Sequence, residues 1–326
     1  MTIHHRRALR ETADQILANT PNEKRLVLLW AGVSALAALL TGLMSYLLDS
    51  GIAGTGGLSG MGMRSVLTTA QQVISTFTSI ALPFWGLGYQ HATLQMARRH
   101  RVSGDSLMEG FRRFGPGLRL TLLQSLLMGG LFFLCFYGTI LFLAMTPLAG
   151  PAFEALEPLM EDFTADPGWV PSDAMADALI KAMLPMAICG IAVACLAILP
   201  LAYRLRFAQL RIMDDPGCGA LQAMGESIRA TRGSCIALIK LDLSFWWFWL
   251  LEGLIVAVTY GDSILPMLGI SLPVSPQVAF WGFYVAAMAL QVAVYWAFHN
   301  RVSVTYALAY DTLISKPEDR QLTIDN

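Results

Sequence analysis

Six apolar stretches, each long enough to cross a bilayer, constrain this chain more than any other feature. A helix rises 1.5 Å per residue, so about 20 apolar residues span the hydrocarbon of a membrane. Backbone N–H and C=O groups find no water in lipid and must pair inside helices. The sequence therefore predicts an all-α, polytopic membrane helix bundle. Its six transmembrane helices are expected at 26–48, 66–96, 120–148, 182–203, 241–260 and 278–298.

Composition supports a membrane protein and argues against a nucleic-acid-binding one. Apolar residues make up 55% of the chain and charged residues 14%, whereas soluble domains carry about 25% charged residues. The net charge is −1, so no basic field is available for nucleic acid. We expect a six-helix domain over 26–312, between a polar N-terminal segment (1–25) and a C-terminal tail (313–326).

The basic residues predict the orientation of the bundle, because Lys and Arg are retained on cytoplasmic flanks. With the N-terminus inside, 20 of the 22 basic residues are cytoplasmic, and only Arg64 and Lys181 are outside. The sequence thus predicts a multi-pass protein of the inner membrane with both termini cytoplasmic. The outer connection 149–181 carries seven acids and is expected to hold a short amphipathic helix.

Two cytoplasmic connections, 98–119 and 211–232, are basic and have apolar residues at helical spacing. Each is expected to lie along the inner headgroups as an amphipathic helix, where basic side chains favour anionic lipid. The partners expected are anionic membrane lipids or, alternatively, a protein on the cytoplasmic face. The candidate contacts are Arg98, Arg99, Arg112, Arg113, Arg229 and Arg232.

An internal repeat relates these two regions when the chain is shifted by 117 residues without a gap. Leu82-Pro83 then falls on Leu199-Pro200, Glu109 on Glu226, and an apolar, a basic and an apolar block align in the same order. We expect two hairpins of the same orientation, related by an axis along the membrane normal. In transporters built this way, binding sites lie at the interface between the repeats.

Two acids in the fifth stretch, Asp242 and Glu252, are the candidate intramembrane functional residues. The other five stretches contain no charged residue. Glu252 lies eleven residues beyond Leu241, about 16 Å along a helix and near mid-bilayer. An ionisable group at that depth indicates a proton or cation ligand. The alternative is a structural carboxyl that is protonated or hydrogen-bonded.

No sequence motif indicates metal, nucleotide or hydrolytic chemistry. The chain has no H-E-x-x-H, no phosphate-binding loop and no G-x-S-x-G. Its five cysteines are widely spaced and lack a C-x-x-C pair, which indicates isolated thiols. We therefore expect no cofactor and no catalytic or metal-binding residue.

One region resembles an uncharacterised bacterial integral-membrane family, domain of unknown function 975. The residues that carry the resemblance are Tyr203, Met213-Asp214-Asp215-Pro216, Ala223, Glu226-Ser227, Gly233 and Leu241-Asp242-Leu243-Ser244-Phe245. More distantly, the chain is similar to the membrane domain of glycerophosphodiester phosphodiesterases. The resemblance implies a multi-helix inner-membrane protein and brings no known activity.

Three functions remain open from the sequence. The first is a non-enzymatic, transporter-like or permease-like protein that binds a small or amphiphilic molecule between the repeated hairpins. The second is an accessory, immunity or export-helper protein that docks a partner or anionic lipid through its basic helices. The third is a membrane-embedded hydrolase, which requires Ser or His to meet Asp or Glu in one cavity.

Overall fold

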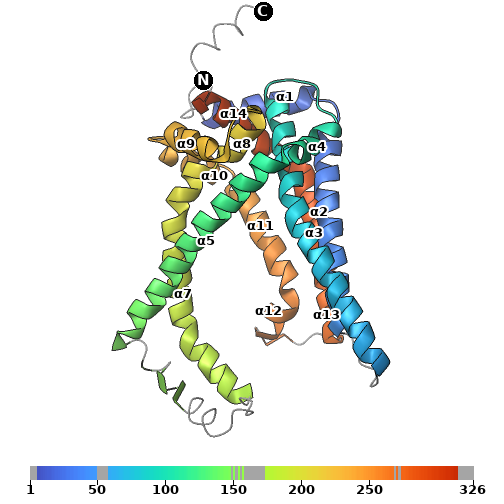
Figure 1. Ribbon diagram of the computed structural model, residues 1–326, viewed down its shortest axis with the longest axis vertical. Coiled ribbons are helices and arrows are strands. Elements are labelled where there is room, and N and C mark those ends of the chain that lie inside the picture. The colour runs from blue at the N-terminus through green and yellow to red at the C-terminus, as the bar shows by residue number, and fades with distance from the viewer. Residues whose placement is uncertain are drawn as a thin grey trace, which may run out of the picture. The chain divides into compact units, whose positions relative to one another are not determined.

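The structure, a computed structural model, describes residues 6–49, 58–147, 150, 153–154, 156–157, 173–267, 269–270 and 273–314. Every element within these ranges is a helix (Figure 1). They are α1 (Arg6–Asn19), α2 (Glu23–Asp49), α3 (Leu58–Ala97), α4 (Asp105–Arg112), α5 (Phe114–Ala144), α7 (Asp173–Leu205), α8 (Ala208–Asp214), α9 (Ala220–Thr231), α10 (Cys235–Leu243), α11 (Trp246–Thr259), α12 (Gly261–Met267), α13 (Pro276–Val294), η2 (Tyr295–His299) and α14 (Asn300–Ile314).

Each of the six predicted stretches falls largely on helices, and the fifth is divided between the short helices α10 and α11. Within the described ranges, four helices are long and apolar enough to cross a membrane: Glu23–Leu48, Phe114–Ala144, Ile180–Asp214 and Gln277–Ile314. A fifth is added if α10 and α11, bent by 67° at a short break, count as one span. The all-helical class is confirmed, with four or five candidate spans.

The predicted second span lies in α3, a continuous helix of 40 residues with Pro83 inside it. This helix is not among the candidate spans, although it contains no charged residue between 66 and 96. Hydroxyl and amide side chains, such as Thr68, Gln71 and Ser75, lower its hydropathy. Several of these hydroxyls bond to a carbonyl one turn earlier, as Thr69 does to Ser65 at 2.9 Å.

The chain divides into two compact units, and the smaller one is residues 121–206. Its contacts join α5 to α7. A Cβ on Gly190 would lie 2.9 Å from the Phe136 ring, so only glycine lets the helices approach there. Met186 is buried against Ile140 and Leu143.

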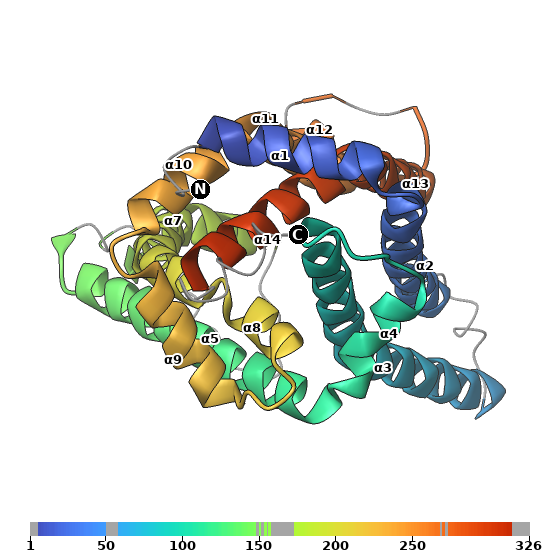
Figure 2. The same ribbon diagram turned by 90° about the horizontal axis from the view of Figure 1, so that it is seen from above.

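The larger unit, residues 1–120 and 207–326, contains the main core at one end. We call this end the headpiece: α1, α4, α8, α9 and α14 with the last turns of α3 (Figure 1). Helices α1 and α14 pack side by side across it (Figure 2). Side chains such as Leu9, Met96, Leu107 and Phe207 are fully buried here. The two ends of the described chain therefore meet in one packed layer.

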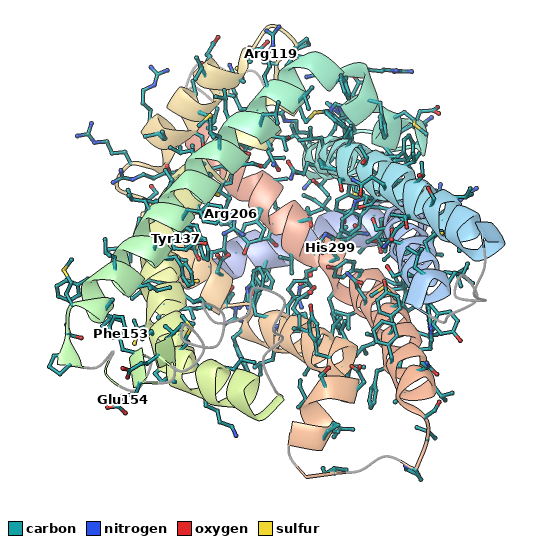
Figure 3. All side chains as sticks on the ribbon, turned by 60° about the horizontal axis from the view of Figure 1, so that its bottom comes forward. Arg119, Tyr137, Phe153, Glu154, Arg206 and His299 are labelled. Carbon is teal, nitrogen blue, oxygen red and sulfur yellow. The ribbon has the colours of Figure 1, made fainter. Side chains whose placement is uncertain are left out.

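Away from the headpiece, the long helices expose apolar side chains. Phe77 on α3 is 70% exposed, whereas Leu94 on the same helix is 1% exposed. In the smaller unit Leu134 is 73% exposed and Tyr137, labelled in Figure 3, is 58% exposed. Large apolar surfaces of this kind are unusual on soluble proteins and suit contact with lipid.

Most of the outer connection 149–181 and the tail from residue 315 lie outside the described residues. So do residues 50–57, between α2 and α3. The predicted outer amphipathic helix and C-terminal tail stay predictions.

Candidate functional site

The fifth predicted span is broken between α10 and α11, and the local sequence explains the break. The Ser244 hydroxyl bonds to the Leu241 carbonyl at 2.6 Å. The backbone N–H groups of Ser244 and Phe245 bond to carbonyls three residues earlier, at 3.0 and 2.9 Å. This tighter bonding ends α10 and leaves nearby carbonyls without their usual helical partners.

Helix α1 supplies donors to the carbonyls around the break. Arg6 Nη1 donates to the Lys240 carbonyl at 3.0 Å, and Arg10 Nη1 donates to the Ser244 carbonyl at 3.2 Å. The Arg10 guanidinium also lies 6.0 Å from the centre of the Phe245 ring. Two arginines one turn apart on α1 thus meet two carbonyls one turn apart on the broken helix.

The predicted residue Asp242 lies at the same break. Its carboxylate accepts a hydrogen bond from the Tyr306 hydroxyl on α14. Asp242 is therefore half-buried and joined to the last helix. Among its neighbours in sequence, Lys240 is exposed.

The other predicted acid, Glu252, lies in α11 and is half-buried. Its carboxylate lies close enough to the Tyr295 hydroxyl to interact with it. Gln291 Nε2 donates to the same hydroxyl at 3.3 Å. Because Tyr295 opens η2, the partner of Glu252 comes from the last helix and not from the repeated hairpins.

Tyr295 and His299 belong to η2, a π-helical turn between α13 and α14. Such turns recur at functional sites. The His299 ring stacks on Trp30 with centres 4.7 Å apart, and it also lies 4.7 Å from Tyr295 and 5.3 Å from Tyr89. We call Trp30, Tyr89, Tyr295 and His299 the aromatic cluster. His299, labelled in Figure 3, has a buried Nδ1 without a hydrogen-bond partner among the described residues.

A buried polar chain joins the aromatic cluster to the start of α2. The Tyr89 hydroxyl donates to Asn300 Oδ1 at 2.6 Å. Asn300, only 4% exposed, donates through Nδ2 to the Glu23 carbonyl at 2.8 Å and to the Glu23 carboxylate. Three helices are thereby fixed around the π-helical turn.

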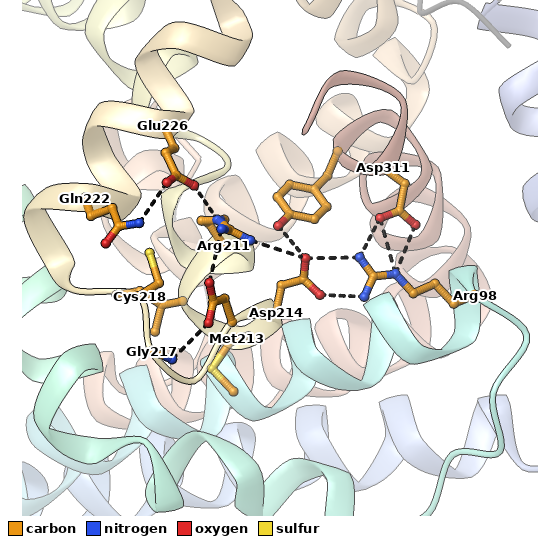
Figure 4. Close-up of polar contacts among 12 residues, drawn as sticks. Arg98, Arg211, Met213, Asp214, Gly217, Cys218, Gln222, Glu226 and Asp311 are labelled. Carbon is orange, nitrogen blue, oxygen red and sulfur yellow. Dashed lines mark hydrogen bonds and ion pairs between the residues drawn. The ribbon is translucent and has the colours of Figure 1, made fainter. Parts of the chain in front are cut away.

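A second polar site, the ionic network, fills the headpiece where α3, α8, α9 and α14 meet (Figure 4). Arg98 pairs with Asp214 at 2.5 Å and with Asp311 at 2.8 Å. The Tyr310 hydroxyl donates to Asp214 at 2.9 Å. Burial opposes the charge of Arg98, but the two carboxylates outweigh it and raise the pKa of Arg98.

The ionic network continues to α9 through Arg211. This side chain bonds to Glu226 and pairs with Asp215 at 3.1 Å. Gln222 Nε2 donates to Glu226 at 2.9 Å. The hydrogen bond from Gln222 and the Arg211 guanidinium lower the pKa of Glu226 despite its partial burial.

The six arginines predicted to contact lipid or a partner have different surroundings. Arg98 is bound in the ionic network, and Arg113, 16% exposed, donates to the Ile212 carbonyl at 2.6 Å. Arg99, Arg112, Arg229 and Arg232 are exposed. Arg98 also reaches the surface, with its side chain 34% exposed, but two carboxylates hold its guanidinium.

The sequence did not predict that the residues of the ionic network come together, nor that those of the aromatic cluster do. Asp214 was part of the family resemblance, and that motif was the available signal for the network. Nothing local marked Trp30, Tyr89 and His299 as neighbours, because they lie on helices far apart in the chain. Among the described residues, no group of three or more His, Cys, Asp or Glu side chains could hold a metal ion.

These features define an all-helical protein in which four or five helices of the described chain are fit to cross a membrane. Residues 1–310 match the family described as Protein of unknown function (DUF975). The chain belongs to this family, and the resemblance of the sequence to it is confirmed. Comparisons with curated proteins and with solved structures give no match. The distant likeness to the membrane domain of glycerophosphodiester phosphodiesterases stays a prediction.

Proposed function

We propose that the protein is a non-enzymatic, transporter-like membrane protein that binds a small amphiphilic molecule beside Glu252. The observation that carries this proposal is the pairing of Glu252 with Tyr295 between a broken helix and a π-helical turn. Transporters build their sites from interrupted helices, and a carboxylate inside a membrane is costly unless it is used or paired. In this protein an interrupted helix and a paired carboxylate occur together, on α11 and η2.

The parallel repeat is part of the proposal, and two contacts support it. A shift of 117 residues places the last turns of α3, residues 91–97, on α8, residues 208–214. These two segments pack against each other. Gln90 bonds to Gln209 at 2.6 Å and Arg98 to Asp214, so contacting positions are separated by 119 and 116 residues. Residues at nearly equivalent positions of two repeats face each other in this way when a pseudo-twofold axis passes between them.

The proposed topology places the headpiece and both termini in the cytoplasm of an inner-membrane protein. The packing of α1 against α14 supports termini on one side. The exposed arginines Arg99, Arg112, Arg229 and Arg232 gather on headpiece elements, which supports a cytoplasmic headpiece. This topology requires α3 to span the membrane as a sixth helix in spite of its polar residues.

Uptake into proteoliposomes tests the proposed function, with tetraphenylphosphonium as the amphiphilic probe. We expect the protein to accelerate uptake over empty liposomes and Glu252→Gln to abolish the increase, because the amide carries neither charge nor a titratable proton. Tyr295→Phe should weaken uptake by about tenfold or less, through loss of the hydroxyl that interacts with the carboxylate.

Asp262→Asn is the matched control, an acid-to-amide change on the neighbouring helix α12. It should leave uptake unchanged. The proposal fails if Glu252→Gln transports like the unmodified protein, or if uptake never exceeds that of empty liposomes.

A further inference from the structure

Helices α4 and α9 expose large apolar side chains on the surface of the headpiece. On α4, Met108 is 50% and Phe111 38% exposed. On α9, Leu221 is 73% and Ile228 37% exposed, and these two lie seven residues apart on one helical face. Each short helix is therefore amphipathic, with one face in the headpiece and one face outward.

The inward faces are fixed closely. A Cβ on Gly110 of α4 would lie 1.9 Å from the Phe84 carbonyl oxygen on α3. Under the 117-residue shift the corresponding residue of α9 is Ser227, and its hydroxyl accepts a bond from the Phe207 N–H at 3.2 Å. Because a small residue docks each helix at the same position, the direction of the outward face is set.

The outward faces repeat as well. Phe111 corresponds to Ile228 and Arg112 to Arg229 under the same shift, and all four are exposed. Arg112 and Arg229 each lie in the last turn of their helix. Arg112 pairs with Glu109 at 3.2 Å but its side chain stays 69% exposed, and Glu226 pairs with Arg211 and not with Arg229. Each helix thus presents an exposed apolar residue followed by an exposed arginine.

The position of these helices in the chain brings them to a membrane surface. Helix α4 ends at Arg112 and the candidate span α5 begins at Phe114. Helix α9 ends at Thr231 and the broken candidate span begins at Cys235. Exposed Ile236 and Trp246 continue the apolar surface onto that span, and tryptophan is common at the membrane interface.

We infer that α4 and α9 are two equivalent interfacial helices that dock on anionic phospholipid, with Phe111 and Ile228 in the acyl boundary and Arg112 and Arg229 on headgroup phosphates. Apolar insertion beside a cation is the chemistry that recognises an anionic lipid surface. Arg98 and Arg113 take no part, because Asp214 and Asp311 hold the Arg98 guanidinium and Arg113 is bound to the Ile212 carbonyl.

Spin labels test the insertion. Phe111→Cys and Ile228→Cys, each made in a chain whose five native cysteines are replaced by serine or alanine, are labelled with a nitroxide in vesicles of three parts phosphatidylcholine to one part phosphatidylglycerol. We expect collisions with oxygen to exceed collisions with a water-soluble nickel chelate. Glu11→Cys is the control, since Glu11 is exposed on the polar face of α1 and should contact the nickel chelate freely.

The amount of phosphatidylglycerol that the purified protein retains tests the role of the charges on Arg112 and Arg229. Phosphatidylglycerol that co-purifies with the detergent-extracted protein should fall about fivefold for each of Arg112→Gln and Arg229→Gln. Arg7→Gln, an exposed arginine on α1, should change nothing. The inference is overturned if the labels at 111 and 228 are as open to nickel as the label at 11, or if retained phosphatidylglycerol is the same in all variants. Labels that are open in vesicles but protected in native membranes would indicate a protein partner and also reject it.

Discussion

At the scale of single residues, Gly110 shows how little room the headpiece leaves. Its missing Cβ allows α4 to lie against the backbone of α3, where Gly88 makes the reciprocal approach to the Leu107 carbonyl oxygen, 1.8 Å from a hypothetical Cβ. Neither backbone can move without disturbing buried neighbours. We expect Gly110→Ala to lower the free energy of unfolding by about 3 kcal/mol or more.

The control for this prediction is Gly129→Ala on α5. No atom lies within 4 Å of the added Cβ there, and alanine favours a helix over glycine. Its melting temperature should match or slightly exceed that of the unmodified protein, as followed by tryptophan fluorescence in detergent. Equal melting of the Gly110→Ala variant would contradict the close contact of α3 and α4.

Glu226 makes the stability of the headpiece depend on pH. Its pKa is lowered in the folded protein, so its contribution is present above the unfolded pKa of about 4.3 and is lost as pH falls through the lower folded pKa. Glu226→Gln should lower the melting temperature at pH 7 by about 3 °C, and the difference should shrink below pH 4. Glu11→Gln, in an exposed pair with Arg7, should show neither effect. A difference that is constant with pH would contradict the role of the charge.

At the scale of helices, the contact of α1 with the broken span predicts unequal effects for three arginines of one helix. Arg6 and Arg10 donate to carbonyls at the break, whereas Arg7 pairs only with Glu11 in the contacts we describe. The double change Arg6→Ala and Arg10→Ala should cost about 1 to 2 kcal/mol and expose Trp247, which is half-buried just after the break. Acrylamide quenching of tryptophan fluorescence measures that exposure, and Arg7→Ala should leave it unchanged.

Sequence length and apolarity predict the long helices well, because a membrane leaves the backbone few alternatives. They do not predict the break after Leu243. That break depends on the Ser244 hydroxyl and on two arginines 234 residues away in sequence. In the same way, the position of Glu252 deep in an apolar stretch identified it as a candidate functional residue. The sequence did not identify its partner Tyr295, because that residue belongs to another helix. Arg98 and Arg112 look alike in sequence, and only the folded headpiece separates a bound charge from an exposed one.

At the scale of the whole molecule, the proposed topology requires that the two basic connections lie on one side of the membrane. Arg101→Cys and Gly219→Cys, made singly in a chain without other cysteines, should react with a membrane-impermeant thiol reagent from the same side. Both positions are exposed, so access is not limited by packing. Labelling from opposite sides would show that α5 and α7 do not both cross the membrane between the two connections, and would reject the proposed topology.

The pairing of Arg98 with Asp214 and Asp311 also sets an order of events during synthesis. These residues come from three widely separated parts of the chain. At 5 to 20 residues per second, a ribosome needs roughly 5 to 20 seconds between Asp214 and Asp311. During that interval Arg98 and Asp214 can already pair, but the second carboxylate on Arg98 and the Tyr310 hydroxyl that donates to Asp214 have not yet been made. A chain terminated before α14 would lack these partners and the helix that packs on α3, so its headpiece would stay incomplete.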